Sequence, residues 1–215
     1  MVRVAGHEHV IQFLDVFEDD THIFFVLELM QYSLIDFLKM RGGRLSEREA
    51  AAVTWKVARG IDHIHSCGIV HFDLKPANIL VNIDKESDCI TSVKIADFGV
   101  SKSKRDNYST ANDIPGTLSF MAPEMLRVNS TFDHRIEAWS LGVMLHQLLT
   151  GKLPFTSKSE RTLARKIVLD DIDFGEDIFE NISIESLDLV ENLLIKDPEQ
   201  RATIQDVLVN SWIQD

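Results

Sequence analysis

The most informative stretch of the chain reads Val70-His71-Phe72-Asp73-Leu74-Lys75-Pro76-Ala77-Asn78-Ile79-Leu80. It places an acid, a base and an amide close together, and a second acid, Asp97, follows in Ala96-Asp97-Phe98-Gly99. A carboxylate can accept the proton of a hydroxyl, a Lys can neutralise a moving phosphate, and Asn and Asp oxygens suit magnesium. These residue types in this order predict phosphoryl transfer from Mg-ATP.

Three ordered motifs resemble those of the eukaryotic protein kinases. They are His71-Phe72-Asp73 with Asn78, Asp97-Phe98-Gly99, and Ala122-Pro123-Glu124. One Asp-Phe-Gly triplet is a weak signal, whereas three motifs in order with kinase-like spacing are specific. The resemblance covers essentially the whole chain. It implies a Ser/Thr protein kinase that transfers the γ-phosphate of ATP to Ser/Thr hydroxyls of proteins, and residues 208–213 are similar to the end of calmodulin-dependent-type kinase domains.

Composition is that of an ordinary globular protein. The 215 residues are 45% hydrophobic and 26% charged, enough for one or two small domains. The net charge of −12 argues against nucleic acid as a partner. No apolar run reaches the ~20 residues of a membrane span, so we expect no membrane partner. Cys67 and Cys89 fit a reduced compartment, and we expect a cytoplasmic protein, with the nucleus as an alternative.

Local patterns predict an α+β fold in which a strand pair precedes a helical body. The resemblance implies that these are a residual strand pair of the small lobe and a kinase-like large helical lobe. Apolar runs at 11–17 and 22–29 predict a hairpin. Ser46 and Glu49 form a capping box for a helix that ends near Gly68. Ser157 and Glu160 predict another capping box. Short strands are expected at 79–81 and 93–95, and further helices at 139–149, 157–168, about 187–194 and 203–212.

The resemblance divides the chain into three parts. Residues 1–27 correspond to a remnant of the small lobe (the end of a helix and two strands), 28–32 to the hinge, and 33–215 to the large helical lobe. The sequence has no Gly-x-Gly-x-x-Gly, no Val-Ala-Ile-Lys-like strand and no helix Glu to pair with that Lys. The alternative function is therefore a catalytically impaired, pseudokinase-like interaction protein or a truncated kinase fragment. A partner could then supply the missing small lobe.

Site roles follow from the resemblance, residue by residue. Asp73 is expected to be the general base, and Lys75 to stabilise charge on the phosphate; this Lys in Asp-Leu-Lys-Pro favours Ser/Thr specificity. Asn78 and Asp97 would bind magnesium, and Thr117 would hydrogen-bond near the catalytic Asp. The residues expected to contact ATP are Leu27 as gatekeeper, Glu28, Met30, Lys75, Asn78, Leu80 and Asp97.

One departure from the family concerns regulation. Phe72 stands where the family often has an Arg that binds the phosphate of the activation loop. Ser109 and Thr110 are the phosphorylation sites that the polar segment offers. Because Phe72 offers no cation, we expect activity to depend little on their phosphorylation, and a large loss in a Ser109→Ala/Thr110→Ala variant would contradict this.

Other features concern structure and substrate. Glu137 stands where the family usually has Asp holding the catalytic loop; Glu137→Asp should raise activity if the longer side chain loosens the loop. Glu124 is expected to pair with Arg201, as in the family. Ala77 replaces the Glu of many kinases that prefer basic substrates, which argues against a strongly basophilic enzyme.

Overall fold

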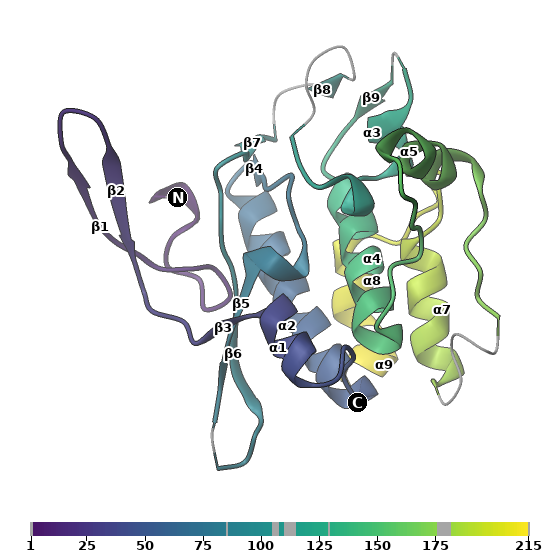
Figure 1. Cartoon of the computed structure of the whole chain (residues 1–215), viewed down its shortest axis with the longest axis horizontal. Coiled ribbons are helices and arrows are strands. Elements are labelled where there is room, and N and C mark those ends of the chain that lie inside the picture. The colour runs from purple at the N-terminus through teal and green to yellow at the C-terminus, as the bar shows by residue number, and fades with distance from the viewer. Residues whose placement is uncertain are drawn as a thin grey trace.

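The computed structural model describes residues 2–84, 86–104, 108–109, 115–128, 130–175 and 182–214. Figure 1 shows a helical body with a pair of strands standing beside it. The helices are α1 (Leu34–Met40), α2 (Glu47–Ser66), α3 (Pro123–Leu126), α4 (Ile136–Thr150), α5 (Glu160–Leu169), α7 (Ile184–Leu193), α8 (Ile204–Val209) and α9 (Ser211–Gln214). The strands are β1 (Phe13–Glu18), β2 (Ile23–Leu27), β3 (Tyr32–Ser33), β4 (Ile69–Val70), β5 (Ile79–Ile83), β6 (Ile90–Ile95), β7 (Lys102–Ser103), β8 (Tyr108–Ser109) and β9 (Thr131–Phe132). The predicted α+β fold is confirmed.

The hydrophobic core lies around α4. Nearly every side chain of this helix is buried, as its uniformly apolar sequence predicts. Helix α2 packs against α4, α8 and strand β6, and α7 packs against α4 (Figure 1). Gly60 of α2 permits the close approach of β6, because a Cβ there would lie 2.8 Å from Ile95 Cδ1 and 2.9 Å from the His9 carbonyl oxygen.

Helix ends differ from the sequence prediction at several places. Helices α4 and α7 each begin about three residues earlier than predicted, and α1 and α3 were not predicted. The capping box of Ser46 and Glu49 is confirmed. The box predicted from Ser157 is wrong, because α5 begins after Ser159, whose side chain accepts from the Thr162 amide. The predicted helix at 203–212 is two short helices: Thr203 caps α8, but the backbone is extended at Asn210 (φ −67°, ψ 133°) before α9.

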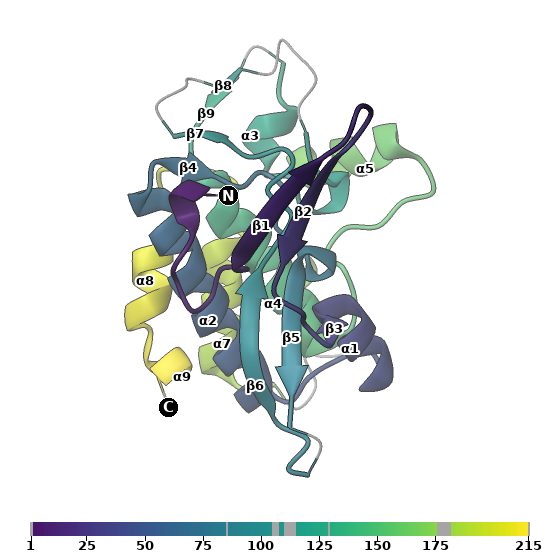
Figure 2. The same ribbon diagram turned by 90° about the vertical axis from the view of Figure 1, so that its left-hand side faces the viewer.

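The hairpin predicted from residues 11–29 is confirmed. Strands β1 and β2 pair antiparallel, with Val16 opposite Phe25 and Phe17 opposite Phe24. Figure 1 shows the pair extending away from the helical body, and Figure 2, seen from that side, shows it in front of the body. Large apolar side chains on both faces are exposed: Leu14, Val16, Phe17, Ile23, Phe24 and Phe25. A two-stranded hairpin is marginally stable alone, so this surface favours contact with further polypeptide.

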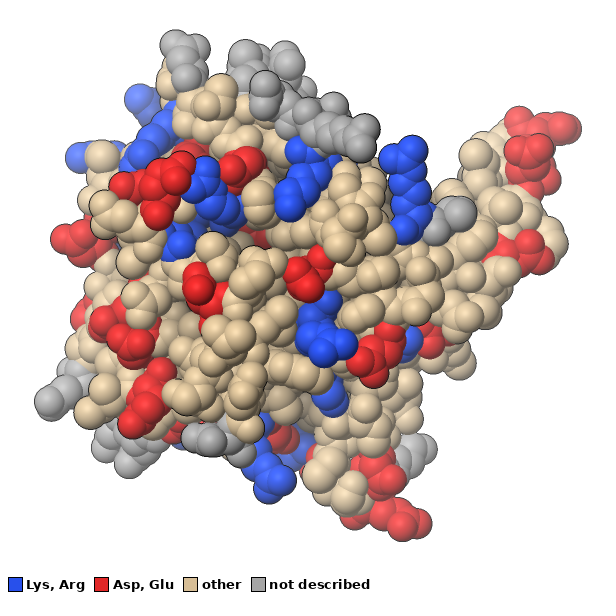
Figure 3. Space-filling model, turned by 180° about the vertical axis from the view of Figure 1, so that it is seen from behind, with Lys and Arg blue, Asp and Glu red and all other residues tan. Residues whose placement is uncertain are grey.

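Charged side chains of both signs mix on the back face of the molecule (Figure 3). The acidic excess of the chain does not gather there into one large patch. No helix in the described part of the chain is both long enough and apolar enough to cross a membrane.

We expect acid to destabilise the fold through His146, which is buried on α4. The ring Nδ1 lies 2.8 Å from the Lys152 carbonyl oxygen, to which a neutral Nδ1–H ring can donate. Burial lowers the pKa of His146, and the hydrogen bond to Lys152 only partly opposes this effect. The unfolded state therefore binds the proton more readily, so the unfolding free energy decreases as pH falls below about 6.5. Urea denaturation at pH 7.5 and 5.5 should show a smaller difference in unfolding free energy between the two pH values in His146→Asn than in the wild type. An unchanged difference would contradict the role of His146 in acid destabilisation. His22→Asn, on the exposed hairpin, is the control.

Candidate active site

The catalytic loop at residues 71–78 connects β4 to β5 and is held by a buried glutamate. Glu137 on α4 accepts hydrogen bonds through Oε1 from the backbone amides of His71 (2.6 Å) and Phe72 (3.1 Å). The His71 ring donates through Nε2 to the Ala96 carbonyl (2.8 Å). These bonds fix the loop both to the core helix and to the segment that carries Asp97.

All four predicted catalytic residues lie together. Asp73 Oδ1 accepts from the Thr117 amide (2.9 Å) and hydroxyl (2.8 Å). Asp73 Oδ2 accepts from Lys75 Nζ (2.6 Å) and Asn78 Nδ2 (2.9 Å). Lys75 Nζ is also 2.6 Å from Thr117 Oγ1, so the ammonium bridges the acid and the hydroxyl. The arrangement holds a carboxylate and a cation side by side, where an acceptor hydroxyl and a phosphate would need them.

Asp73 is held in its ionised form. Burial by itself would raise its pKa, but the hydrogen bonds from Lys75 and Thr117 and the charge of Lys75 bring the pKa below its ordinary value. The carboxylate is therefore charged at neutral pH and can accept a hydrogen bond from a substrate hydroxyl.

The two predicted metal ligands lie at adjoining ends of two paired strands. Asn78 immediately precedes β5 and Asp97 closely follows β6, and Ile79 pairs with Ile95 in this sheet. The Ala96 amide donates to the Asn78 carbonyl oxygen (2.8 Å), which brings the two segments together. The backbone is left-handed at Asp97 (φ +63°), and a turn at Gly99 and Val100 follows, where the Ser101 amide donates to the Phe98 carbonyl oxygen (3.2 Å). Phe98 is half-buried and its ring contacts the His71 ring edge-on.

The predicted nucleotide contacts come from neighbouring segments. Leu27 ends β2, and β3 pairs with β5, where Ser33 lies opposite Leu80. Met30 Sδ lies 3.6 Å from Asn82 Nδ2 on β5. The Glu28 carboxylate pairs with Lys94 on β6 (2.8 Å) and accepts from the Gln12 amide (2.7 Å). The side chain of Glu28 therefore joins the hairpin to the body, and its backbone amide donates to the Gln12 carbonyl oxygen (3.0 Å), so both groups are already engaged.

The sequence did not predict the role of His65. Its Nε2 is 2.5 Å from Glu137 Oε2, and both side chains are buried. Burial by itself would raise the pKa of Glu137, but the charge of His65 and its hydrogen bond bring that pKa below the ordinary value. The sequence did indicate that His65 is buried, because it follows Ile61 by four residues and therefore lies on the same buried face of α2.

We expect Glu137→Asp to lower activity. The glutamate spans two loop amides and His65 at once, so the longer side chain is accommodated rather than loosening the loop. An aspartate falls short of one partner. Loss of a hydrogen bond to a charged group, even one of the weaker bonds of this kind, should lower the rate about tenfold. Initial rates of phosphate transfer, with thermal unfolding as the fold control, test this. A higher rate in Glu137→Asp would show that the loop is loose.

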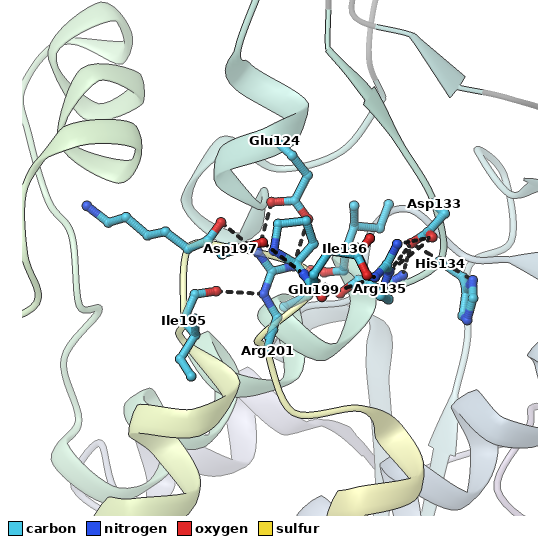
Figure 4. Close-up of polar contacts among 12 residues, drawn as sticks. Glu124, Asp133, His134, Arg135, Ile136, Ile195, Asp197, Glu199 and Arg201 are labelled. Atoms are coloured by element: carbon cyan, nitrogen blue, oxygen red, sulfur yellow. Dashed lines mark hydrogen bonds and ion pairs between the residues drawn. The ribbon is translucent and has the colours of Figure 1, made fainter.

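A second buried ion pair joins distant parts of the helical body (Figure 4). Arg201 contacts Glu124 of α3 through two parallel bonds, Nη1–Oε1 at 2.7 Å and Nη2–Oε2 at 2.8 Å. Arg201 also donates to the carbonyl oxygens of Arg135 (3.1 Å) and Ile195 (2.9 Å). The predicted pair is confirmed, and it fixes the Ala-Pro-Glu segment to the loop before α8.

Not every predicted position can be placed. Thr110 lies outside the described residues, and Ser109 is described only through its backbone in β8. The prediction about their phosphorylation therefore stays a prediction.

Comparison with known proteins agrees with this geometry. The family model described as protein kinase domain matches residues 1–213. A probable myosin light chain kinase of Dictyostelium discoideum is 35% identical over 213 residues, covering 99% of this chain and 60% of the relative. A CDPK-related protein kinase of Daucus carota is 35% identical over 212 residues (98% of this chain, 34% of the relative), and a calcium/calmodulin-dependent serine/threonine-protein kinase 1 of Oryza sativa subsp. japonica is 34% identical over 212 residues (98% and 34%). The chain thus spans between about a third and three-fifths of the length of these relatives. It belongs to the protein kinase family.

Proposed function

We propose that this chain is the catalytic region of a Ser/Thr protein kinase, which transfers the γ-phosphate of ATP to Ser/Thr hydroxyls of proteins. The observation that carries the proposal is the network of Asp73, Lys75, Asn78 and Thr117. Each of these four side chains contacts another of the set at hydrogen-bond distance. A scaffold that only binds partners has no need of this arrangement.

Each residue of the network has one task in the transfer. Asp73 accepts the proton of the substrate hydroxyl as the new phosphorus–oxygen bond forms and the bond to ADP breaks. Lys75 places its positive charge where the transferred phosphoryl group gains negative charge. Thr117 holds both, because its hydroxyl lies between Asp73 Oδ1 and Lys75 Nζ. Thr117 and Lys75 together favour a Ser/Thr acceptor.

Asn78 and Asp97 are suited to hold magnesium. The Asn78 amide nitrogen donates to Asp73, so the side-chain oxygen of Asn78 is the atom available for a cation. The exposed Asp97 carboxylate supplies the second oxygen ligand. No cluster of three or more His, Cys, Asp or Glu side chains in the described residues could hold a metal alone. This agrees with magnesium, which binds one or two carboxylates together with substrate phosphates and neutralises their charge.

A second candidate function is non-catalytic interaction, and the exposed hairpin favours it. The sequence has neither the Gly-rich loop nor the strand Lys that position ATP phosphates in the family. We propose that residues 28–32 form the hinge and that the apolar faces of β1 and β2 are covered by a partner polypeptide that supplies these small-lobe elements. Weak nucleotide binding by the purified chain, strengthened by such a partner, is the expected result. We also propose a cytoplasmic location.

Phosphoamino-acid analysis tests the proposed function. Purified chain is incubated with labelled Mg-ATP and a generic protein acceptor, and the acceptor is hydrolysed. We expect phosphoserine and phosphothreonine. Phosphotyrosine as the main product would contradict the Ser/Thr assignment, and a folded chain that gives no label would favour the non-catalytic candidate.

A further inference from the structure

Phe72 has an unusual backbone conformation in the middle of the catalytic loop. Its φ is +74°, in the left-handed region that bulky residues rarely adopt. Phe72 is 6% exposed, and most of the loop around it is buried as well. Strain at such a position persists only where the surroundings hold it, so the contacts of this ring are informative.

The ring of Phe72 packs against two aromatic residues from distant segments. The Tyr108 ring meets it edge-on, with centroids 4.6 Å apart at 86°, and the Phe132 ring lies 6.2 Å away at 64°. Tyr108 and Phe132 stack on each other at 5.6 Å. We call these three residues the Phe72 cluster. Such edge-to-face and offset contacts are the favourable geometries for aromatic pairs.

The Phe72 cluster joins three parts of the chain. Phe72 belongs to the catalytic loop, Tyr108 to β8 in the segment between Asp97 and Thr117, and Phe132 to β9. Strands β8 and β9 pair so that Tyr108 lies opposite Phe132, near α3 (Figure 1). Tyr108 is buried, and its hydroxyl donates to the Ser103 carbonyl oxygen in β7. Strand β8 is therefore held by apolar packing as well as by backbone pairing.

This packing acts on the residue next to Asp73, which Thr117 contacts. Thr117 bonds to Asp73 through its amide and its hydroxyl, and β7 pairs with β4, which directly precedes the catalytic loop. Lys102 Nζ lies 5.4 Å from the centre of the Phe72 ring, so even the nearby cation contacts the ring face. An aromatic ring offers no donors to a phosphate, whereas it packs well against another ring.

We propose that Tyr108 is a positioning residue: its packing against Phe72 and Phe132 holds Phe72, and with it the adjacent Asp73, in place, so that Asp73 can bond to Thr117. Apolar packing thereby takes the place of an ion pair between a phosphate and a cation. The expected effect of Tyr108 on the rate of phosphate transfer rests on the proposed kinase function. The expected effect on amide hydrogen exchange does not depend on that function.

The test compares Tyr108→Ala with Tyr108→Phe, which keeps the ring and removes only the hydroxyl. Hydrogen exchange of amides at 115–121 should accelerate in Tyr108→Ala and remain close to wild type in Tyr108→Phe. The turnover number of phosphate transfer should fall about tenfold in Tyr108→Ala and be restored in Tyr108→Phe, as expected for loss of an aromatic pair. Circular dichroism checks that both variants fold.

The two readouts separate this proposal from the proposed function. If the wild-type chain transfers no phosphate, the kinase function fails, while exchange at 115–121 still decides the role of Tyr108. Wild-type exchange at 115–121 in Tyr108→Ala overturns the proposal. An equal acceleration in Tyr108→Phe also overturns it, because the hydroxyl and not the ring would then be responsible.

Discussion

Asp73→Asn is expected to lower the rate of phosphate transfer by about 10²–10⁴-fold, the usual contribution of a positioned general base. Asparagine has the same shape and can still accept from Thr117 through its oxygen. It loses the negative charge that pairs with Lys75 at 2.6 Å and the capacity to take the proton of the acceptor. The fold should survive, because Asp73 is only partly buried and its neighbours are polar.

Steady-state kinetics on the purified protein measure this effect. Mg-ATP affinity, measured by calorimetry, should change little, so that the loss appears in the turnover number. Asp84→Asn is a matched control, since this exposed carboxylate caps the turn after β5, where it accepts from the amides of Glu86 and Ser87. A near-wild-type rate in Asp73→Asn would show that the carboxylate does not act as the base.

Removing one partner of the buried Glu124–Arg201 pair should lower the unfolding free energy by roughly 3–5 kcal/mol. The two side chains are 5% and 0% exposed, so Glu124→Ala leaves an uncompensated guanidinium in the core. Replacing both with apolar residues of similar size, as in Glu124→Leu/Arg201→Met, should recover much of the loss because neither charge is then buried.

Urea denaturation followed by fluorescence measures these differences. Lys39→Ala, which removes a solvent-exposed pair with Asp36 at 2.8 Å, should have a much smaller effect because solvent screens this pair. If Glu124→Ala costs no more than Lys39→Ala, the buried pair does not stabilise the Ala-Pro-Glu segment in the way that its geometry indicates.

Much of this fold could be predicted from the sequence where the signal is local. The capping box at Ser46, the uniformly apolar run of α4 and the two apolar runs of the hairpin each depend on neighbours a few residues apart. The catalytic set was predictable for a similar reason, because Asp73, Lys75 and Asn78 lie in one short loop. The failure at Ser157 is also local: Ser159 offers an equally good cap two residues later, and the sequence does not distinguish them.

The contacts that the sequence did not predict are formed between distant segments. Nothing near Phe72 indicates that Tyr108 and Phe132 will surround it, since these rings meet only through the pairing of β8 and β9. His65 and Glu137 meet because α2 packs on α4. Such packing depends on the three-dimensional arrangement of whole elements, which periodicity within one element does not specify.

The most direct test of the central claim is phosphate transfer from labelled Mg-ATP to a generic protein acceptor by purified residues 1–215. An Asp73→Asn/Asp97→Ala variant, which lacks both the proposed base and one proposed magnesium ligand, gives the background. Transfer clearly above that background is the predicted result, because the catalytic set is assembled within this chain. Transfer equal to the background by a correctly folded chain would contradict the claim that the assembled set is sufficient for catalysis.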